Sequence, residues 1–366
     1  MSPKLKIMFA FLMSLALAFG YLDYFTNTAR SFERLHIFLF NLCSGGTIIL
    51  YFSEEKRRLT AKTITFLILG VAYAVLAFLE WYISAMAVSL VLAGIVESIR
   101  MKKFSVFPWG FVRYNEPVSA KFHQASLLCL SMGLFMSTAV LLNNEYMHWI
   151  YLPKLTLNVF FLGFSFPSSL ITMSLIFSYM EKGGNGVVRP LKELGFWAIN
   201  LGVIIFFIFI IFEQLAWQVV VTLVLFLAVA MILWIHVRLG LPQQQKGFLT
   251  SGLGFLVCTA ITGIAYIFLE ITPGYDPEKY RWLLRLHAFA SLYGWNLCGL
   301  AVITRYFDFP ISLNSKALIG GHWFVVVLLA PIGHLHPILA LAAVGGYMAV
   351  LFTVFFSQRL AKPGLE

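Results

Sequence analysis

The sequence Arg-Leu-His-x-Phe occurs twice, at residues 34–38 and 285–289, and each copy lies at the start of a long apolar stretch. An ionisable residue inside a membrane segment is costly, and it usually has a function. Two imidazoles that face each other across a helical bundle can supply both axial ligands of a haem iron. The repeat therefore predicts that His36 and His287 ligate one low-spin haem, of the b type because the chain has no CxxCH motif.

The residues around each histidine suit the rest of such a cofactor. Arg34 and Arg285 lie two residues before the histidines, where a guanidinium can pair with a haem propionate. Five aromatic residues are expected to wall the ring: Phe38, Phe40, Phe289, Tyr293 and Trp295. Four glycines are expected to let a flat macrocycle approach the backbone: Gly45, Gly46, Gly294 and Gly299.

A second metal-ligand pattern is the His-x-His pair formed by His334 and His336. Imidazole binds copper and zinc well, so this pair is a candidate site for copper or zinc. The same residues also suit a polar turn between two apolar segments. Both interpretations stay open at this stage. His123 and His322 lie near the other surface of the membrane, and their side chains are expected to snorkel to that surface.

The composition is that of a polytopic membrane protein. Of 366 residues, 60% are hydrophobic and 11% are charged, and the mean hydropathy is +0.86. These values exclude an ordinary soluble domain. The four cysteines all lie in apolar segments and form no CxxC, so they are expected to be buried thiols. No small-residue cleavage site follows the first apolar run, which predicts an uncleaved first helix.

A membrane-spanning helix needs roughly 20 apolar residues. Applied to this chain, that length predicts an all-α polytopic protein, residues 1–366 forming a single membrane domain with twelve spans. The predicted spans are 5–24, 35–53, 62–82, 84–99, 122–142, 153–180, 194–213, 215–236, 247–270, 283–305, 317–333 and 336–357.

The basic residues predict the orientation of these spans. Alternate loops hold 20 of the 26 Lys and Arg residues, and the other loops hold six. Basic residues favour the cytoplasmic side, so both termini are expected to be cytoplasmic. The net charge of +10 is explained by the basic residues in the cytoplasmic loops. The expected partner is therefore the lipid bilayer, and binding to nucleic acid is not expected. His36, His287, His334 and His336 then belong to the outer side.

The spacing of the motif predicts an internal threefold repeat. The second and tenth spans carry the motif, and the sixth span carries Leu157-Asn158-Val159-Phe160, in which Asn158 replaces histidine. The expected repeats are residues 1–121, 122–246 and 247–366, which gives three pseudo-symmetric groups of four helices. Membrane proteins built from repeats often place ligand sites between the repeats.

In these residues the chain resembles subunit I of the haem-copper oxidase superfamily, in particular the cbb3-type oxidases and nitric oxide reductases. The resemblance lies in Arg34-Leu35-His36 followed by Gly45-Gly46, and in His287 followed by Gly294-Trp295. It implies twelve helices, a haem between the second and tenth, and a cytochrome c, a copper protein or other respiratory subunits as partners. The NnrS family of membrane haem proteins is similar in size. The resemblance also implies a bacterial inner membrane.

The departures from the oxidase pattern bear on activity. Arg285 stands where the oxidases carry a second histidine, and Asn158 stands in the sixth span where they supply a metal ligand. We therefore expect an oxidase-like haem protein in electron transfer or in respiratory or nitric oxide metabolism. Whether it is itself an oxidoreductase stays open, since His334 and His336 are the remaining candidates for a copper site. Two alternatives are a transporter or channel for an anionic or metal solute and a non-catalytic scaffold subunit of a respiratory complex.

Overall fold

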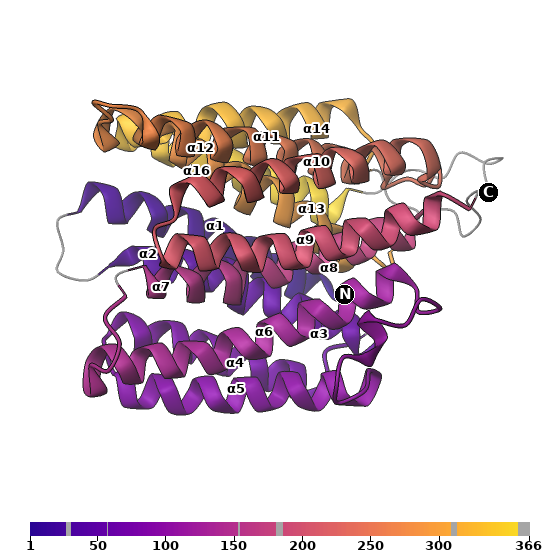
Figure 1. Ribbon diagram of the computed structural model, residues 1–366, viewed down its shortest axis with the longest axis horizontal. Helices are drawn as coiled ribbons and strands as arrows, with labels where there is room; N and C mark the ends of the chain where they lie inside the picture. Colours follow the sequence, from indigo (N-terminus) through magenta and orange to yellow (C-terminus); the bar gives the residue numbers. More distant parts are fainter. Residues whose placement is uncertain (27–30, 57, 153, 181–185, 309–312, 358–366) are drawn as a thin grey trace.

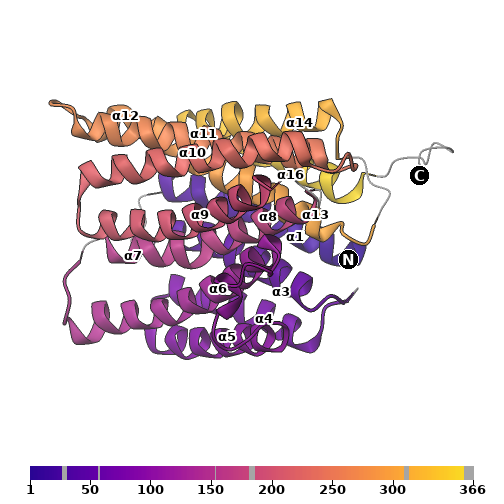
Figure 2. The ribbon, with the colours of Figure 1, turned by 45° about the vertical axis from the view of Figure 1, so that its right-hand side comes forward.

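The chain folds into a bundle of long helices that run along a common direction (Figures 1 and 2). The computed structural model describes residues 1–366 except 27–30, 57, 153, 181–185, 309–312 and 358–366, and it describes only the backbone of residues 157, 158 and 160. The described part contains no β-strand, and twelve of its helices are long and apolar enough to cross a membrane. The all-α polytopic class is therefore confirmed.

Seven of the twelve spans are single uninterrupted α-helices. They are α1 (Pro3–Phe25), α4 (Ala61–Phe78), α5 (Tyr82–Lys103), α9 (Val188–Ile211), α10 (Leu215–Leu239), α11 (Lys246–Ile271) and α16 (Pro337–Phe356). The fifth span is α6 (Val118–Leu142) continued by the π-helical turn η3 (Asn143–Met147), and a short 3-10 turn, η2 (Trp109–Phe111), precedes it. The eleventh span consists of α14 (Lys316–Trp323), the π segment η6 (Phe324–Leu329), α15 (Ala330–Ile332) and the 3-10 turn η7 (Gly333–Leu335).

Spans 2, 6 and 10 each contain a π-helical segment between two α-helical parts. Span 2 is α2 (Phe32–Ile37), η1 (Phe38–Gly46) and α3 (Thr47–Ser53). Span 6 is α7 (Leu155–Asn158), η4 (Val159–Ser165) and α8 (Phe166–Ser178). Span 10 is α12 (Pro277–Phe289), η5 (Ala290–Asn296) and α13 (Leu297–Thr304). Segments of π-helix are rare in proteins, and those that do occur are often found at functional sites.

The same three spans form the centre of the bundle. In their most apolar windows 89%, 72% and 78% of the residues are buried, whereas the other nine spans bury 28–50%. Span 2 contacts span 6, and span 10 contacts both of them. The outer spans therefore face lipid on one side, and spans 2, 6 and 10 are enclosed by protein.

Side chains cap backbone carbonyls in the three π segments, whose widened turns change the normal helical hydrogen bonding. The Ser44 hydroxyl donates to the Leu39 carbonyl at 2.8 Å, and His322 Nε2 lies 2.8 Å from the Tyr293 carbonyl. Asn296 Nδ2 lies 3.4 Å from the Ser165 carbonyl, the last of η4. Because a bare carbonyl inside a membrane is costly, these caps help to stabilise the interruptions.

Glycines allow the central spans to approach closely. A Cβ on Gly45 would lie 2.7 Å from Ser168 Oγ, and a Cβ on Gly299 would overlap Thr172. Gly294 packs against Phe255 and Gly46 against Phe66. Small residues at helix crossings are typical of membrane proteins. The expectation that these glycines face a macrocycle is wrong, because protein side chains fill the space beside each of them.

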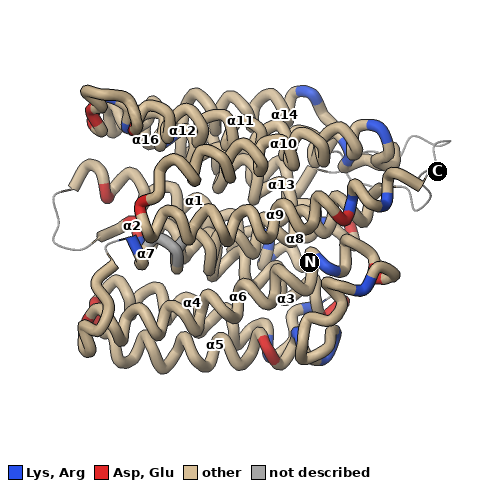
Figure 3. Tube along the Cα trace, in the orientation of Figure 1, with Lys and Arg blue, Asp and Glu red and all other residues tan. Residues whose placement is uncertain are grey.

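Lys and Arg residues gather at one end of the bundle, called here the basic end, where α1 begins (Figure 3). Lys6 of α1 forms an ion pair with Asp308, whose carboxylate also lies 3.1 Å from Arg305 Nε. Arg305 donates further to the carbonyls of Val354 and Ser357 at 2.8 and 2.7 Å. This buried network ties the beginning of α1 to the ends of spans 10 and 12. The opposite end, which carries both Arg-Leu-His-x-Phe motifs, is called the motif end.

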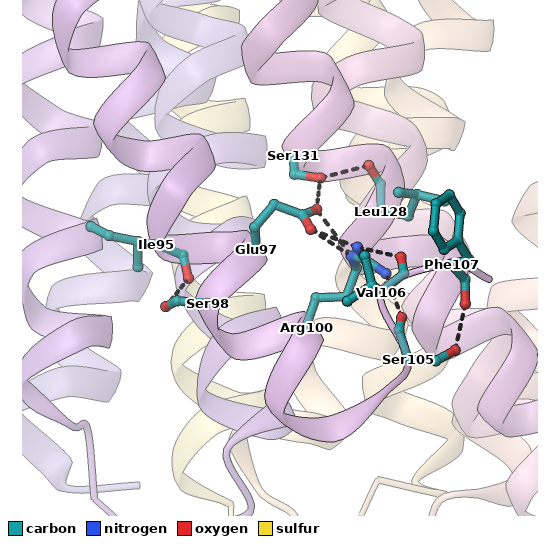
Figure 4. A network of polar contacts seen from close by, with 9 residues as sticks. All are labelled: Ile95, Glu97, Ser98, Arg100, Ser105, Val106, Phe107, Leu128 and Ser131. Carbon is teal, nitrogen blue, oxygen red and sulfur yellow. Dashed lines mark hydrogen bonds and ion pairs between the residues drawn. The ribbon is translucent and has the colours of Figure 1, made fainter.

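A second network fixes the loop between α5 and α6 at the basic end (Figure 4). Glu97 accepts from Arg100 Nη2 at 2.6 Å and from the Ser131 hydroxyl at 2.5 Å. Arg100 is 3% exposed and also donates to the carbonyls of Ser105 and Val106. Glu97 thus forms an ion pair with Arg100 within α5, and its hydrogen bond with Ser131 connects α5 to α6.

The structure corrects two predictions about histidines. Span 10 begins at Pro277 rather than at residue 283, so His287 lies ten residues into the helix, and His36 lies four residues into span 2. His322 and His123 are fully or almost fully buried, at 0% and 5% exposure. The expected snorkelling of these two is therefore wrong, because packed aromatic rings and hydrogen bonds hold both inside the protein.

Glu80 follows the C-terminal end of α4, and its backbone lies in the left-handed region, with φ of 63°. This region is strained for a residue with a Cβ, and glycine relieves the strain. We predict that Glu80→Gly raises the free energy of unfolding by about 0.5–1 kcal/mol, measured by thermal or denaturant unfolding in detergent. Glu80→Ala is the control, because it removes the carboxylate and keeps the Cβ. Equal stability of the two variants would contradict this explanation.

The charge asymmetry generates a prediction of orientation. Tyr151 at the motif end is 91% exposed, and Phe107 at the basic end is 67% exposed. In a background without the native cysteines, Tyr151→Cys should react with a membrane-impermeant maleimide in intact cells, because basic residues favour the cytoplasmic side. Phe107→Cys should react only after the membrane is opened. The reverse labelling pattern would refute the predicted orientation.

Candidate functional site

His36 is held by two oxygen atoms at its Nδ1. The Ala16 carbonyl of α1 lies 2.8 Å from this nitrogen, and the Tyr293 hydroxyl of span 10 lies 2.9 Å from it. A carbonyl oxygen can only accept, so Nδ1 must carry the proton. The lone pair of the neutral ring then belongs to Nε2.

His287 is held in the same way by the preceding span. Its Nδ1 lies 2.9 Å from the Thr259 carbonyl of α11 and 3.4 Å from the Thr262 hydroxyl. Again a carbonyl fixes the proton on Nδ1 and leaves the lone pair on Nε2. Each motif histidine therefore has one carbonyl and one hydroxyl at the same ring nitrogen.

A glycine stands against each ring in the corresponding position. Gly20 lies four residues after Ala16, and a Cβ there would lie 2.7 Å from His36 Nδ1. Gly263 lies four residues after Thr259, and a Cβ there would lie 3.0 Å from His287 Cε1. Residues four apart lie on the same helical face, so carbonyl and glycine together form one flat surface for the ring. The π segments begin two residues after His36 and three after His287.

The outer nitrogen of each ring is left for a ligand. Neither Nε2 has a hydrogen-bond partner among the residues that the structure describes. Both histidines are partly exposed, although they lie in membrane-spanning helices. Metal-ligating histidines almost always have the other ring nitrogen bonded to a carbonyl, a carboxylate or water, which fixes the tautomer and the ring orientation. The two imidazoles have this arrangement.

The two imidazoles are anchored on different helices, His36 on α1 and His287 on α11. Span 10 reaches span 2 through Tyr293, whose ring lies 5.6 Å from that of His36, and Phe289 in turn contacts Tyr293 at 5.8 Å. Side chains two residues apart in an α-helix point about 200° apart. With Phe289 facing Tyr21 of the first span and His334 of the eleventh, His287 faces α11 instead. His36 and His287 are therefore two separately anchored candidates for a haem ligand.

The motif end contains an aromatic cluster around His334. The His334 ring lies 5.0 Å from Tyr21, 5.1 Å from Tyr24 and 5.6 Å from Phe289. Arg285 stacks over the Tyr24 ring at 4.4 Å. His334 is buried, with 8% of its surface exposed. The cluster therefore joins the first, tenth and eleventh spans next to His36.

His334 and His336 face different surroundings. His336 is exposed, and its Nδ1 accepts from the Ile338 backbone at 3.2 Å, so it caps α16. His334 lies in the aromatic cluster instead. No group of three His, Cys, Asp or Glu side chains in the described ranges is arranged to hold a metal ion. The positions of His334 and His336 agree with the interpretation that the two residues belong to a polar turn.

The other predicted cofactor contacts lie apart from one another. Phe38 packs edge-on against Tyr73 at 5.0 Å, and the Trp295 indole donates to the Ser169 hydroxyl at 2.7 Å. Arg34 donates to the Ala77 carbonyl of α4 at 3.1 Å. Of the predicted ring-wall residues, Tyr293 contacts His36 directly, and Phe40 and Phe289 pack against Tyr293. The side chain of Asn158, the predicted third ligand position, lies outside the described residues.

The comparisons with known proteins add no relative. No family model, no curated protein and no solved structure matches this chain. The resemblance to the oxidases and to NnrS therefore stays a prediction, and the argument for function rests on the two histidine sites.

The glycines beside the histidines generate a prediction. Gly20→Ala places a methyl group against His36 and should destabilise the protein by about 1–3 kcal/mol through overpacking. Gly94→Ala in α5 is the matched control, since a Cβ there meets nothing within 4 Å and alanine favours a helix. Unfolding in detergent measures both. A Gly20→Ala variant as stable as Gly94→Ala would show that the ring does not occupy this position.

Proposed function

We propose that this chain is a membrane-embedded haem protein in which His36 and His287 each provide one axial imidazole. The observation that carries the proposal is the matched anchoring of the two rings, with Nδ1 on a backbone carbonyl and Nε2 left without a partner. Histidine is the usual proximal ligand of haem iron. Ligands fixed in this way lose little freedom on binding a metal.

The two ligands belong to separate haems in this proposal, because His36 faces α1 and His287 faces α11. A haem held by one imidazole supplies an iron that exchanges electrons and keeps one position for a small diatomic molecule such as nitric oxide. This agrees with a role in electron transfer or in respiratory or nitric oxide metabolism, with a cytochrome c or a copper protein as electron partner.

Arg285 and Arg34 are the residues proposed for the haem propionates. Arg285 is half-buried at the motif end, where its guanidinium stacks on Tyr24. Stacking uses the face of the guanidinium and leaves its edge donors for a carboxylate. Arg34 uses one nitrogen on the Ala77 carbonyl and has others available. Both lie near the predicted outer surface of a bacterial inner membrane, with the termini on the cytoplasmic side.

A transporter or channel is the second candidate function. The observation in its favour is the interruption of spans 2, 6 and 10 by π segments at the centre of the bundle. Non-α backbone at membrane depth is tolerated where it is enclosed by protein or lines a cavity, and it is common at solute sites. This function predicts colourless protein and solute uptake by proteoliposomes.

Optical spectra and haem content test the haem proposal. Purified wild-type protein should show a sharp absorption band on reduction with dithionite. His36→Ala and His287→Ala should each lose about half of the bound haem, and the double variant should lose all of it, because each imidazole is proposed to hold its own iron. His336→Ala is the control and should keep the wild-type content, because this exposed residue caps α16.

Two outcomes would contradict this assignment. Loss of all haem from either single variant would show that the two histidines share one haem. A wild-type spectrum in both variants, or colourless wild-type protein, would exclude both histidines as haem ligands and favour the transporter.

A further inference from the structure

Span 6 presents a line of hydroxyl groups to the two other central spans. Asn296 Nδ2 of span 10 lies 3.1 Å from Ser165 Oγ. One turn further, Ser168 lies against Gly45 of span 2, where an added Cβ would come within 2.7 Å of Oγ. Another turn further, Thr172 lies against Gly299 of span 10. This line therefore runs along the junction of spans 2, 6 and 10.

Helical spacing places an asparagine of span 2 at the same junction. Spans 2, 6 and 10 all run from the motif end to the basic end. Asn41 lies four residues, about one turn, before Gly45, whose neighbour in span 6 is Ser168. Asn296 of span 10 contacts Ser165, which lies about one turn before Ser168. Asn41, Ser168 and Asn296 therefore come from the three central spans within about one turn of one another.

Three oxygens at this junction are buried without a partner among the described residues. They are Asn41 Oδ1, Ser168 Oγ and Asn296 Oδ1, and their residues are 2%, 0% and 1% exposed. Buried polar atoms are nearly always bonded, and an exception calls for an explanation such as a bound ion or water. All three atoms can accept, and each belongs to a different central span.

We propose that these oxygens hold a small monovalent cation. Hard cations prefer oxygen ligands, and divalent ions such as Ca²⁺ are normally held by carboxylates. The proposed ligands carry no charge, and the described residues form no acidic metal cluster, so a single positive charge suits the site. Membrane proteins hold Na⁺ with neutral oxygens beside interrupted helices.

The test measures thermal unfolding of the purified protein in detergent, followed by tryptophan fluorescence. Replacing choline chloride with NaCl at equal ionic strength should raise the Tm by about 3 °C, because the ion binds only the folded protein. LiCl and KCl define the size preference. Ser168→Ala and Asn296→Leu should each abolish the rise.

Asn200→Leu is the matched control, because Asn200 lies in α9, outside the three central spans, and its amide bonds its own helix at the Phe196 carbonyl. This variant should keep the wild-type response to NaCl. Equal Tm values in NaCl and choline chloride for the wild type would overturn the proposal, and so would a rise that persists in Ser168→Ala. The haem spectrum is independent of this readout, so failure of one proposal leaves the other standing.

Discussion

The packing of spans 2, 6 and 10 against one another is the constraint on which the rest of the structure depends. These three spans are enclosed by the other nine, so their polar atoms must find partners inside the protein. Glycines at the contacts let the backbones approach, and π segments shift the phase of each helix where they meet. Such a shift changes the helical hydrogen bonding, and in η5 the buried imidazole of His322 caps the Tyr293 carbonyl.

The same packing determines the position and the protonated ring nitrogen of the two motif histidines. Each ring lies on the helix that precedes its own in the chain, between a backbone carbonyl and a glycine one turn later. The carbonyl fixes the proton on Nδ1, and the glycine makes room for the ring. The result is an imidazole whose lone pair on Nε2 is directed away from its anchor. That two distant parts of the chain build this arrangement separately is the strongest reason to regard both histidines as ligands.

Hydropathy and loop length sufficed to predict twelve spans, because each apolar stretch is long enough to cross a bilayer. The start of span 10 was missed because Glu278, Lys279 and Arg281 occupy the first turns of α12, and charge there hides the helix from hydropathy. The motif also pointed to His36 and His287, whose Nδ1 atoms each lie against a backbone carbonyl of the preceding span. Gly20 and Gly263 carry a recognisable signal, since each lies in the preceding span four residues after the carbonyl that holds the ring.

The sequence could not predict the direction in which each histidine side chain points. His287 and Phe289 differ by two positions, and only the packing of α12 decides that Phe289 faces α1 and His287 faces α11. Electron paramagnetic resonance of the oxidised, purified protein tests the central claim most directly. We predict the high-spin ferric signal of iron held by a single imidazole. A low-spin signal of iron between two imidazoles would contradict the claim that His36 and His287 serve separate sites.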